Sequence, residues 1–355
     1  MLYNIYVKSF LFFIGCDSLT THKIICSNSD NLSMIADKSI HLIVTSPPYP
    51  MISMWDEVFI KWSNDDKLFN KPPIEIFKIS HNCLNSVWQE CDRVLIDGGF
   101  ICINIGDATR TVNDNFQLFS NHSEIIKWFT SHGYFNLPDI IWHKLNNSPN
   151  SFMGSGMYPA GAYVTYEHEY ILIFRKSRNR IFINEEQIRR KQSAYFYEER
   201  NEWFSDIWNI KGTNQIIKNL NSSRQRNASF PFEIPYRLIN MYSIDGDIIL
   251  DPFNGLGTTT LSAIASNRNS IGIDIDKSVC KIAKQNISMS MLPLNSYVTS
   301  RLNKHKQFVT NNDNNLNYFN NYHNFKVKTK QEQQIQLKKP IKIYAQNDCI
   351  CCNYD

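Results

Sequence analysis

The sequence has 355 residues, a formal net charge of +4 and a hydrophobic fraction of 43%. This length allows one large α/β domain with insertions or two domains, and the apolar content excludes disorder over the chain as a whole. The nine cysteines show no paired spacing over most of the chain, which indicates reduced thiols and excludes a disulfide framework. The small positive charge is compatible with a polyanionic partner.

The first 18 residues, MLYNIYVKSFLFFIGCDS, contain a short apolar run followed by Gly15 and Cys16. We expect a buried strand or helix here. The alternative is an export signal, but the segment has one lysine and an apolar core of only about eight residues, the lower limit for such a signal. No other stretch approaches the roughly 18 apolar residues that a membrane span needs.

Apolar runs and segments of helical periodicity then alternate along the chain. We expect strands at 22–26, 41–46, 100–107, 139–144, 169–176, 247–253 and 270–276. We expect a turn and a helix within 29–35, and helices at 83–95, 123–133, 234–243, 258–267 and 276–287. The glycines of IDGG (96–99) are expected to end the second of these helices. The alternation predicts an α/β fold with a largely parallel sheet covered by helices on both faces.

Two segments differ from this pattern. Residues 175–226 contain twelve Lys or Arg, six Asp or Glu and several aromatic residues. The tail from Asn311 is rich in Asn, Gln and Lys, and we expect it to be mobile or loosely packed. Its CICC run (349–352) does not have the spacing of four tetrahedral ligands, so we expect free thiols and no metal site.

The stretch TSPPYP (45–50) follows an apolar run. Proline has no backbone N–H, so this segment cannot continue as an interior strand. It leaves the hydroxyl of Ser46 and the carbonyl of Pro47 as hydrogen-bond acceptors, beside the aromatic ring of Tyr49. Taken alone, the pattern also fits a strand that ends at prolines and places a tyrosine in the core.

A second stretch, DIILDPFNGLGTTTLSAIA (247–265), places a glycine-rich turn between a strand and a helix of small residues. Gly255 and Gly257 would let a ligand approach the backbone closely. A dinucleotide fingerprint would have a third glycine where Thr260 stands. Asp274 ends the next predicted strand, where a carboxylate can accept hydrogen bonds from ribose hydroxyls. The turn therefore suits an adenosine-bearing cofactor, with a purely structural turn as the alternative.

Together these stretches resemble the β class of S-adenosylmethionine-dependent DNA methyltransferases, which modify the exocyclic N4 of cytosine or N6 of adenine. The catalytic motif of that family stands here as Ser46-Pro47-Pro48-Tyr49, and its cofactor motif DPFxGxGTT matches Asp251 to Thr259 throughout. The order of the motifs is that of the β class. Further matches lie at 93–107, 167–176 and 227–239, and the resemblance covers residues 22–290.

The resemblance implies a Rossmann-like methyltransferase fold with a small insertion for target recognition. It divides the chain into a catalytic half (20–175), a target-recognition region (176–226), a cofactor-binding half (227–295) and a polar tail (296–355). It implies S-adenosyl-L-methionine as the cofactor. The residues expected to hold it are Asp251, Pro252, Phe253, Gly255, Gly257, Thr258, Thr259 and Asp274, with Asp30 near the adenine and Phe230 as either a cofactor contact or a core residue.

The chemistry of an exocyclic amine explains the catalytic motif. The lone pair of the amine is delocalised into the base, and acceptors that hold its N–H groups expose that lone pair. Ser46 and Pro47 are the expected acceptors, while the prolines fix the backbone. Flipping the base out of the duplex costs a few kcal/mol, and stacking it on Tyr49 would return about 1–3 kcal/mol. In the family, serine in the first position is typical of cytosine, so we predict N4-cytosine, with N6-adenine as the alternative.

The expected partner is double-stranded DNA. Basic side chains of the 176–226 region could bind it, although a solvated basic surface is the alternative for each of them. The candidates are Arg189, Arg190, Lys191, Arg224 and Arg226. The family further implies a restriction–modification system with a cognate endonuclease, a monomer or dimer, and the cytoplasm of a bacterial, archaeal or phage-infected cell.

Other enzyme classes fit less well. Cytosine C5 methylation needs a cysteine nucleophile, typically after proline, and no Pro-Cys pair occurs. HEYIL (168–172) lacks the second histidine of the HExxH zinc motif. A nicotinamide dehydrogenase would leave TSPPY unexplained. A catalytically dead, methyltransferase-derived DNA-binding protein and a methyltransferase acting on RNA or protein remain open alternatives.

Overall fold

The computed structural model describes residues 19–112, 115–145, 153–154, 157–212, 230–312 and 316–355. The first 18 residues, for which the sequence predicts a buried strand or helix, lie outside this part of the chain. Within these ranges, no helix combines the length and the apolar character of a bilayer-spanning segment.

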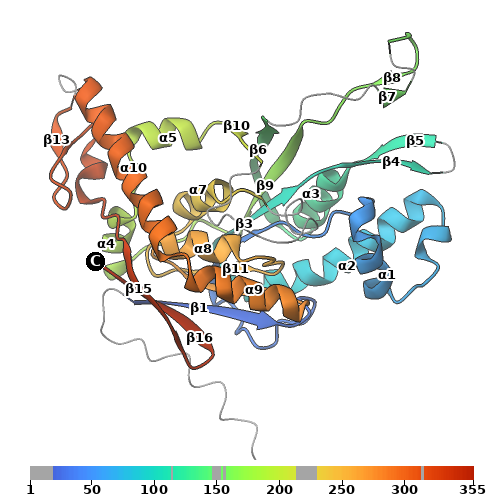
Figure 1. Ribbon diagram of the computed structural model, residues 1–355, viewed down its shortest axis with the longest axis horizontal. Coiled ribbons are helices and arrows are strands. Elements are labelled where there is room, and N and C mark those ends of the chain that lie inside the picture. The colour runs from blue at the N-terminus through green and yellow to red at the C-terminus, as the bar shows by residue number, and fades with distance from the viewer. Residues whose placement is uncertain (1–18, 113–114, 146–152, 155–156, 213–229, 313–315) are drawn as a thin grey trace, which may run out of the picture.

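One ten-stranded sheet forms the centre of the molecule (Figure 1). Its strands are β1 (Leu19–Cys26), β2 (Ile40–Thr45), β3 (Leu95–Ile105), β6 (Tyr134–Lys144), β9 (His168–Lys176), β10 (Ile207–Ile210), β11 (Ile248–Asp251), β12 (Asn269–Asp274), β15 (Pro340–Gln346) and β16 (Cys349–Tyr354). They lie side by side in the order β10-β6-β9-β3-β2-β11-β12-β1-β16-β15. Strands β9 and β16 are each antiparallel to both of their neighbours, and the other neighbouring strands of this sheet are parallel to one another. The sheet is therefore mostly parallel, as predicted.

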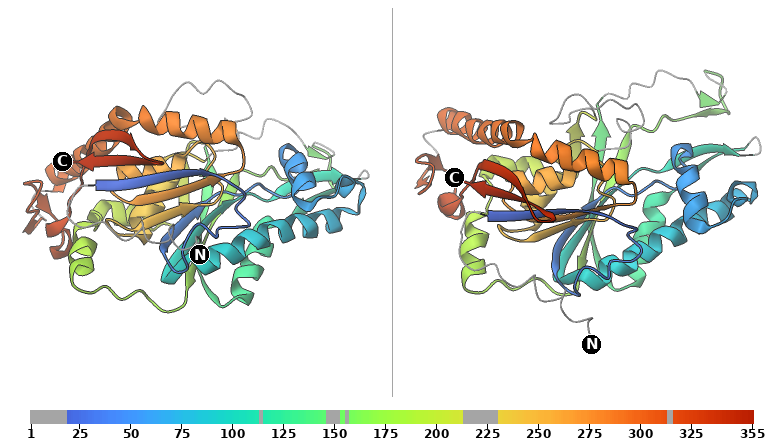
Figure 2. Two further views of the ribbon diagram at one scale, coloured as in Figure 1. Left: turned by 90° about the horizontal axis from the view of Figure 1, so that it is seen from below. Right: turned by 60° about the horizontal axis from the view of Figure 1, so that its bottom comes forward.

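Helices cover both faces of the sheet (Figure 2). The first face packs against α1 (Asp56–Ser63), α2 (Pro73–Val94) and α3 (Asn121–Ser131). The second face packs against α7 (Glu233–Tyr242), α8 (Thr258–Ala265), α9 (Lys277–Ser288) and α10 (Met291–Asn312). Central strands such as β2 are buried on both faces, which explains the continuous apolar run IHLIV in the sequence.

Shorter elements surround this core. They are α4 (Glu185–Gln192), α5 (Tyr197–Trp203), the 3-10 turns η2 (Ser53–Trp55), η3 (Leu68–Asn70) and η5 (Lys330–Gln334), and the strand pairs β4 (Ala108–Val112) with β5 (Asn115–Phe119), β7 (Met153–Gly154) with β8 (Ala162–Tyr163) and β13 (Tyr318–Phe319) with β14 (Lys326–Val327). The β4–β5 and β7–β8 hairpins project from the same end of the molecule (Figure 1).

The helix expected at 29–35 is wrong, because this segment is a loop of turns. The side chain of Asn31 accepts a hydrogen bond from the backbone N–H of Ser33 at 3.0 Å. The N–H of Leu32 donates to Glu90 of α2 at 2.6 Å. Short polar side chains that bond to the local backbone compete with helix formation, and here they fix a turn instead.

The glycines of IDGG do not end the preceding helix. That helix ends at Val94 and the chain passes directly into β3, which contains both glycines. Gly98 has φ +80°, and a Cβ atom there would lie 2.5 Å from the backbone nitrogen of Arg180. Gly98 is therefore required by the close approach of the segment after β9 and not by a helix terminus.

The tail is expected to be mobile or loosely packed, but its last part, β15 and β16, belongs to the sheet. Strand β16 pairs with β1, and β15 extends the sheet beyond it. Cys352 and Tyr354 are buried against α8 and α10. The Tyr354 hydroxyl donates to the carbonyl of Ile264 at 2.9 Å and bonds the Thr20 hydroxyl at 2.9 Å. The CICC run is thus strand, and all cysteines in the described part of the chain are free thiols.

We predict that Tyr354→Phe lowers the free energy of unfolding by about 0.5–1.5 kcal/mol, because the Thr20 hydroxyl and the carbonyl of Ile264 each lose a buried hydrogen bond, although the carbonyl keeps the N–H of Asn267 at 3.1 Å. Tyr318→Phe is the matched control, since Tyr318 lies in the same tail but is 39% exposed. Urea unfolding of both variants measures the difference. Equal stability of the two variants would show that the tail does not support the sheet.

Candidate active site

The two predicted motifs meet at one edge of the sheet. Strands β2 and β11 are parallel neighbours, with Leu42 opposite Ile249 and Ile43 opposite Leu250. Both strands therefore end at the same, carboxyl edge. The hydroxyl of Thr45, the last residue of β2, donates to the carboxylate of Asp251, the last residue of β11, at 2.7 Å. Ser46 and the glycine-rich turn therefore follow the adjacent ends of two neighbouring strands.

Asp251 joins three segments through one buried carboxylate. Besides Thr45, it accepts hydrogen bonds from the hydroxyl of Thr259 at 2.7 Å and the backbone N–H of Phe253 at 3.0 Å. Burial raises the pKa of Asp251 to about 6, although the hydrogen bonds from Thr259, Thr45 and Phe253 act in the opposite direction. The acid of the DPF motif therefore has a structural role that its position in the motif did not reveal.

The glycine-rich turn has the open geometry that a close ligand requires. Gly255 has φ +49° and Gly257, the N-cap of α8, has φ +87°, both in the left-handed region. Among the residues that the structure describes, only the carbonyl oxygen of Phe253 would lie near a Cβ atom at Gly255, at 4.0 Å, so these residues leave one side of the turn open. At Gly257 a Cβ atom would lie 3.5 Å from Ala283, so this glycine also lets α9 pack closely.

Asp274 lies beside this turn at the end of β12. One carboxylate oxygen accepts a hydrogen bond from the N–H of Gly255 at 3.0 Å, and the other accepts from the N–H of Asp276 at 2.9 Å. Burial raises the pKa of Asp274, and these two bonds oppose the rise. The carboxylate is thereby held at the edge where a ribose would pass. Thr258, the first residue of α8, adjoins the same turn.

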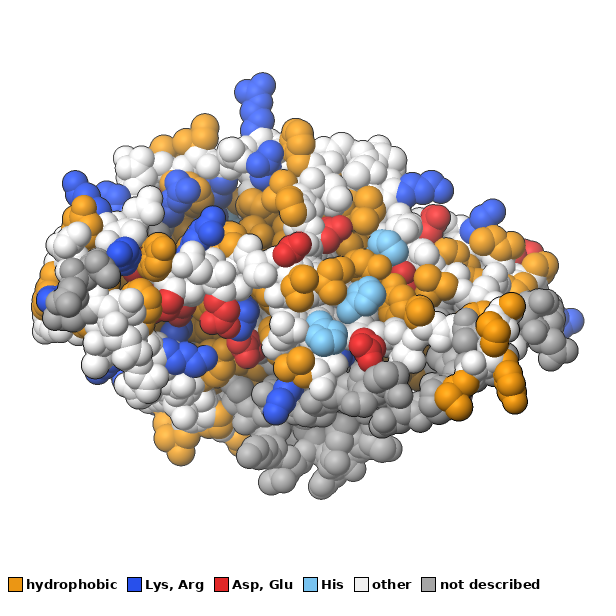
Figure 3. All heavy atoms as spheres, turned by 90° about the horizontal axis from the view of Figure 1, so that it is seen from above, with side chains coloured by type: hydrophobic (Ala, Val, Ile, Leu, Met, Phe, Trp, Pro, Cys, Tyr) orange, Lys and Arg blue, Asp and Glu red, His pale blue; other side chains and the backbone are white. Residues whose placement is uncertain are grey.

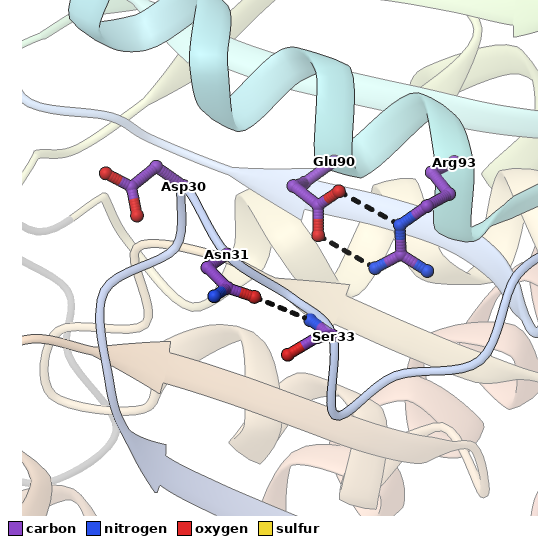
Figure 4. A pocket seen from close by; sticks show the side chains of 5 residues that line it. All are labelled: Asp30, Asn31, Ser33, Glu90 and Arg93. Atoms are coloured by element: carbon purple, nitrogen blue, oxygen red, sulfur yellow. Dashed lines mark hydrogen bonds and ion pairs between the residues drawn. The ribbon is translucent and has the colours of Figure 1, made fainter.

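Asp30 lies in the loop after β1. Its neighbour Ser29 donates a hydrogen bond to the carbonyl of Pro252, so this loop contacts the DPF segment. Asp30 also lines a pocket of about 440 Å³, where the ion pair between Glu90 and Arg93 forms the opposite wall (Figure 4). The structure thus brings Asp30 close to the predicted cofactor turn.

Phe230 belongs to the core. It is 7% exposed and packs in the apolar cluster that contains Ile234 and Leu238 of α7. Of the two roles that the sequence allowed for Phe230, the structure shows core packing.

The catalytic segment leaves β2 and turns sharply. Ser46 is half-buried, whereas Pro47, Pro48 and Tyr49 are buried. Met51 adopts φ +68°, a left-handed conformation that is uncommon for a side chain of its size. In the described part of the chain, no side-chain or loop hydrogen bond ends on the carbonyl of Pro47.

A chain of polar side chains connects the catalytic segment to the neighbouring strands. The Tyr49 hydroxyl donates to Glu169 at 2.8 Å, and the Ser46 hydroxyl lies 3.0 Å from that of Tyr49. The amide of Asn104 donates to the Tyr49 oxygen at 2.7 Å and to Glu169 at 2.6 Å. Lys144 forms an ion pair with Glu169. We call Ser46, Tyr49, Asn104, Glu169 and Lys144 the Tyr49 cluster.

Three members of the Tyr49 cluster had no role in the sequence analysis. Lys144 ends β6, and Glu169 lies at the start of β9. Because β9 is antiparallel to β3 and β6, its start lies at the carboxyl edge too. Asn104 is a polar residue within an apolar strand. A polar residue in or at the end of such a strand is the only sequence signal these positions carry, and pairing across β3, β9 and β6 is needed to bring them together.

The ring of Tyr49 is more enclosed than a base-stacking role suggested. Tyr49 is 9% exposed, and a Cβ atom at Gly106 would lie 3.0 Å from the ring. Burial and the negative charge of Glu169 raise the pKa of Tyr49 well above its usual value. Tyr49 is therefore a neutral hydrogen-bonding residue as well as an aromatic one.

The structure places the three predicted basic residues that it describes, Arg189, Arg190 and Lys191, away from this edge. Arg189 donates to the carbonyl of Asp245 at 2.9 Å, and Asp245 lies just before the start of β11. Helix α4 is therefore at the amino edge of the sheet, opposite Ser46. Arg190 of the same helix packs over the ring of Phe182 at 4.5 Å. Lys191 also belongs to α4, while Arg224 and Arg226 lie outside the described residues.

The surface on the side where β6 ends is not strongly basic in its middle. Figure 3 shows histidine and acidic side chains there among apolar ones, with Lys and Arg mostly farther out. At the carboxyl edge, His143 of β6 lies opposite His168 of β9, and His122 bonds to Asp107 at 2.8 Å. These polar side chains adjoin the strands that carry the Tyr49 cluster.

Comparison with known proteins agrees with this geometry. The family model of the N6/N4 DNA methylases matches residues 40–285, which include both motifs. The chain belongs to the DNA methylase family. M.MthZI, a Type II methyltransferase of Methanothermobacter thermautotrophicus, is 46% identical over 326 residues, which cover 90% of this chain and 91% of that protein. M.MjaI, a Type II methyltransferase of Methanocaldococcus jannaschii, is 48% identical and covers 78% of this chain and 94% of that protein.

A solved structure shares the fold of this DNA methylase. It is a putative DNA modification methylase of Thermus thermophilus in complex with S-adenosyl-L-methionine. It is 29% identical, with a TM-score of 0.58, and the match covers 75% of this chain and 94% of that one. The Rossmann-like methyltransferase fold expected from the sequence is confirmed.

We predict that Asp251 makes stability depend on pH. Its pKa is raised in the folded state, so the folded protein binds this proton more tightly than the unfolded chain does. Relative to Asp251→Asn, the free energy of unfolding of the wild type should fall by about 2–3 kcal/mol as pH rises from about 3 to about 7, through the raised pKa of about 6, and then stay level. Denaturant unfolding across this range measures the difference.

Asp276→Asn is a control for which the stability difference from the wild type should change with pH in the opposite direction. Hydrogen bonds from Ser278 lower the pKa of Asp276, so its contribution to stability should grow as pH rises through the acidic range. A constant difference between the wild type and Asp251→Asn over this range would contradict the role assigned to Asp251.

Proposed function

We propose that this DNA methylase transfers a methyl group from S-adenosyl-L-methionine to the exocyclic N4 of cytosine in duplex DNA. The observation that carries the proposal is the hydrogen bond between Thr45 and Asp251, because it holds the SPPY segment beside the glycine-rich turn. A methyl donor in that turn and an amine at Ser46 would lie at one edge of one sheet. The identities with two Type II methyltransferases support the same reaction class.

The residues at the turn fit the cofactor. When bound, S-adenosyl-L-methionine supplies an electrophilic methyl group on a sulfonium. Gly255 leaves open space on one side of the turn, where the backbone can approach the cofactor. Asp274 offers a half-buried carboxylate to the ribose hydroxyls, and Asp30 lies in the adjoining loop, where it would accept a hydrogen bond from the adenine.

The SPPY segment positions the amine. The hydroxyl oxygen of Ser46 and the carbonyl of Pro47 accept its two N–H groups, which exposes the nitrogen lone pair toward the donated methyl group. Tyr49 stacks on the flipped base with the accessible part of its ring. Orientation is the main catalytic device here, because methyl transfer requires the nitrogen and the methyl carbon in line.

The neutral acceptor favours cytosine over adenine. Ser46 places a hydroxyl, and not a carboxylate, at the first position of the motif. In the family that SPPY resembles, this residue is typical of N4-cytosine targets. N6-adenine is the second candidate, and the family as a whole includes both.

The decisive experiment is incubation of the protein with unmethylated genomic DNA and isotopically labelled S-adenosyl-L-methionine, followed by digestion to nucleosides and mass spectrometry. We expect label in N4-methylcytosine. Label in N6-methyladenine would overturn the choice of base, and label in neither nucleoside would overturn the enzymatic function. RNA and protein included in parallel reactions would reveal another substrate class.

The names of the relatives also suggest a biological setting. Both are Type II methyltransferases, so we propose that this enzyme protects a site that a cognate restriction endonuclease cleaves. Plasmid DNA isolated from cells that express the enzyme should resist that endonuclease. Full cleavage of the plasmid at the methylated sequence would exclude this role.

The place of α4 predicts that it does not hold the DNA backbone at the catalytic edge. We expect Lys191→Ala to leave the slope of log affinity against log salt unchanged, because Lys191 belongs to a helix at the amino edge of the sheet. Titration of a fluorescent duplex at several salt concentrations measures this slope. A loss of about 0.9 from the slope would mean that Lys191 neutralises one phosphate and that the DNA reaches this edge.

A further inference from the structure

We propose that Glu169 is a positioning residue that acts through Tyr49: it fixes the direction of a hydrogen-bond chain so that Ser46 presents only lone pairs to the target amine. This inference rests on the proposed function. Glu169 lies outside the SPPY motif, and the motif by itself does not determine whether its serine donates or accepts.

The direction of the hydrogen-bond chain follows from the number of protons that its members can donate. A carboxylate accepts hydrogen bonds only, so at 2.8 Å the single O–H of Tyr49 points to Glu169. The Tyr49 oxygen already accepts from the amide of Asn104 at 2.7 Å. Tyr49 then has no proton left for Ser46, and the 3.0 Å contact between their oxygens requires the Ser46 hydroxyl to donate. The chain runs from Ser46 to Tyr49 to Glu169.

Glu169 is held firmly enough to impose this direction. Its carboxylate receives the amide of Asn104 at 2.6 Å and an ion pair from Lys144, and its side chain is 12% exposed. A Cβ atom at Gly106 would lie 3.2 Å from Cγ of Glu169 and 3.0 Å from the ring of Tyr49. The absence of a side chain at position 106 therefore lets the carboxylate and the phenol come together.

The direction matters because the substrate is itself a donor. A free serine hydroxyl can donate or accept, and a serine proton aimed at the amine would face N–H groups and repel them. With its proton committed to Tyr49, Ser46 can only accept. A hydrogen-bond chain that ends on an anion also polarises each oxygen along it, which makes Ser46 a stronger acceptor than an isolated hydroxyl.

The test compares Tyr49→Phe, Glu169→Gln and the double variant in steady-state methylation of duplex DNA. Tyr49→Phe keeps the ring and removes only the hydroxyl. We expect kcat to fall about 10- to 100-fold in each single variant, the scale of losing a charge-assisted hydrogen bond. The KM values for DNA and for S-adenosyl-L-methionine should change less than about 3-fold, since the cofactor turn and the base-stacking ring remain. Thermal melting reports whether each variant folds.

The double variant tests whether the two residues act as one chain. Without the Tyr49 hydroxyl, Glu169 has no connection to Ser46, so the double variant should be no slower than Tyr49→Phe alone. Glu124→Gln is the matched control. Glu124 lies on α3, where it forms an ion pair with Lys127 at 3.7 Å, and it is not part of the Tyr49 cluster, so its kcat should equal that of the wild type.

Each outcome decides the inference. Wild-type kcat in a folded Tyr49→Phe variant would overturn it, and so would a double variant whose loss is the product of the two single losses. A rise in KM alone would assign these residues to binding and would also overturn it. If the wild type methylates neither cytosine nor adenine, the proposed function fails; if it methylates and Tyr49→Phe is equally fast, only this inference fails.

Discussion

The hydrogen bonds to the carboxylate of Asp251 connect all parts of the site. Three groups donate to this carboxylate: the hydroxyl of Thr45 at the end of β2, the hydroxyl of Thr259 in the first turn of α8, and the N–H of Phe253 in the turn that follows β11. An acid buried this deeply is unfavourable unless donors surround it, so these three donors are constrained to one geometry. The SPPY segment and the glycine-rich turn, about two hundred residues apart in the chain, are therefore held at fixed relative positions.

The sequence predicted the sheet and the two motifs well, because both depend on local signals. Apolar runs such as HLIV specify strands that are buried on both faces, and the glycines of the turn are needed for backbone conformations that few other residues adopt. The tail could not be predicted in the same way. Strand β15 is an edge strand in which four of the seven residues are exposed, and it belongs to the sheet through its pairing with β16, which lies far from the motifs in the sequence.

The Tyr49 cluster could not be predicted from the sequence for a related reason. Glu169, Asn104 and Lys144 come from three strands, and no spacing along the chain connects them. Glu169 reaches the carboxyl edge only because β9 runs antiparallel to the strands on both sides. The alternation of elements in the sequence indicated a mostly parallel sheet but gave no sign of this reversal, so the start of β9 could not be assigned to the edge that holds Ser46.

The basic region shows why a count of charges does not locate a DNA site. Some of its basic side chains already interact with other parts of the protein. Arg180 forms ion pairs with Asp247 and Glu186, and Arg189 donates a hydrogen bond to the carbonyl of Asp245. These contacts bind the segment after β9 to the amino edge of β11 and so support the strand that carries Asp251. The arginines thus stabilise the catalytic edge from the opposite side of the sheet. At the opposite, carboxyl edge, the strand ends carry histidine and acidic side chains, among them His143 of β6 and His168 and Glu169 of β9.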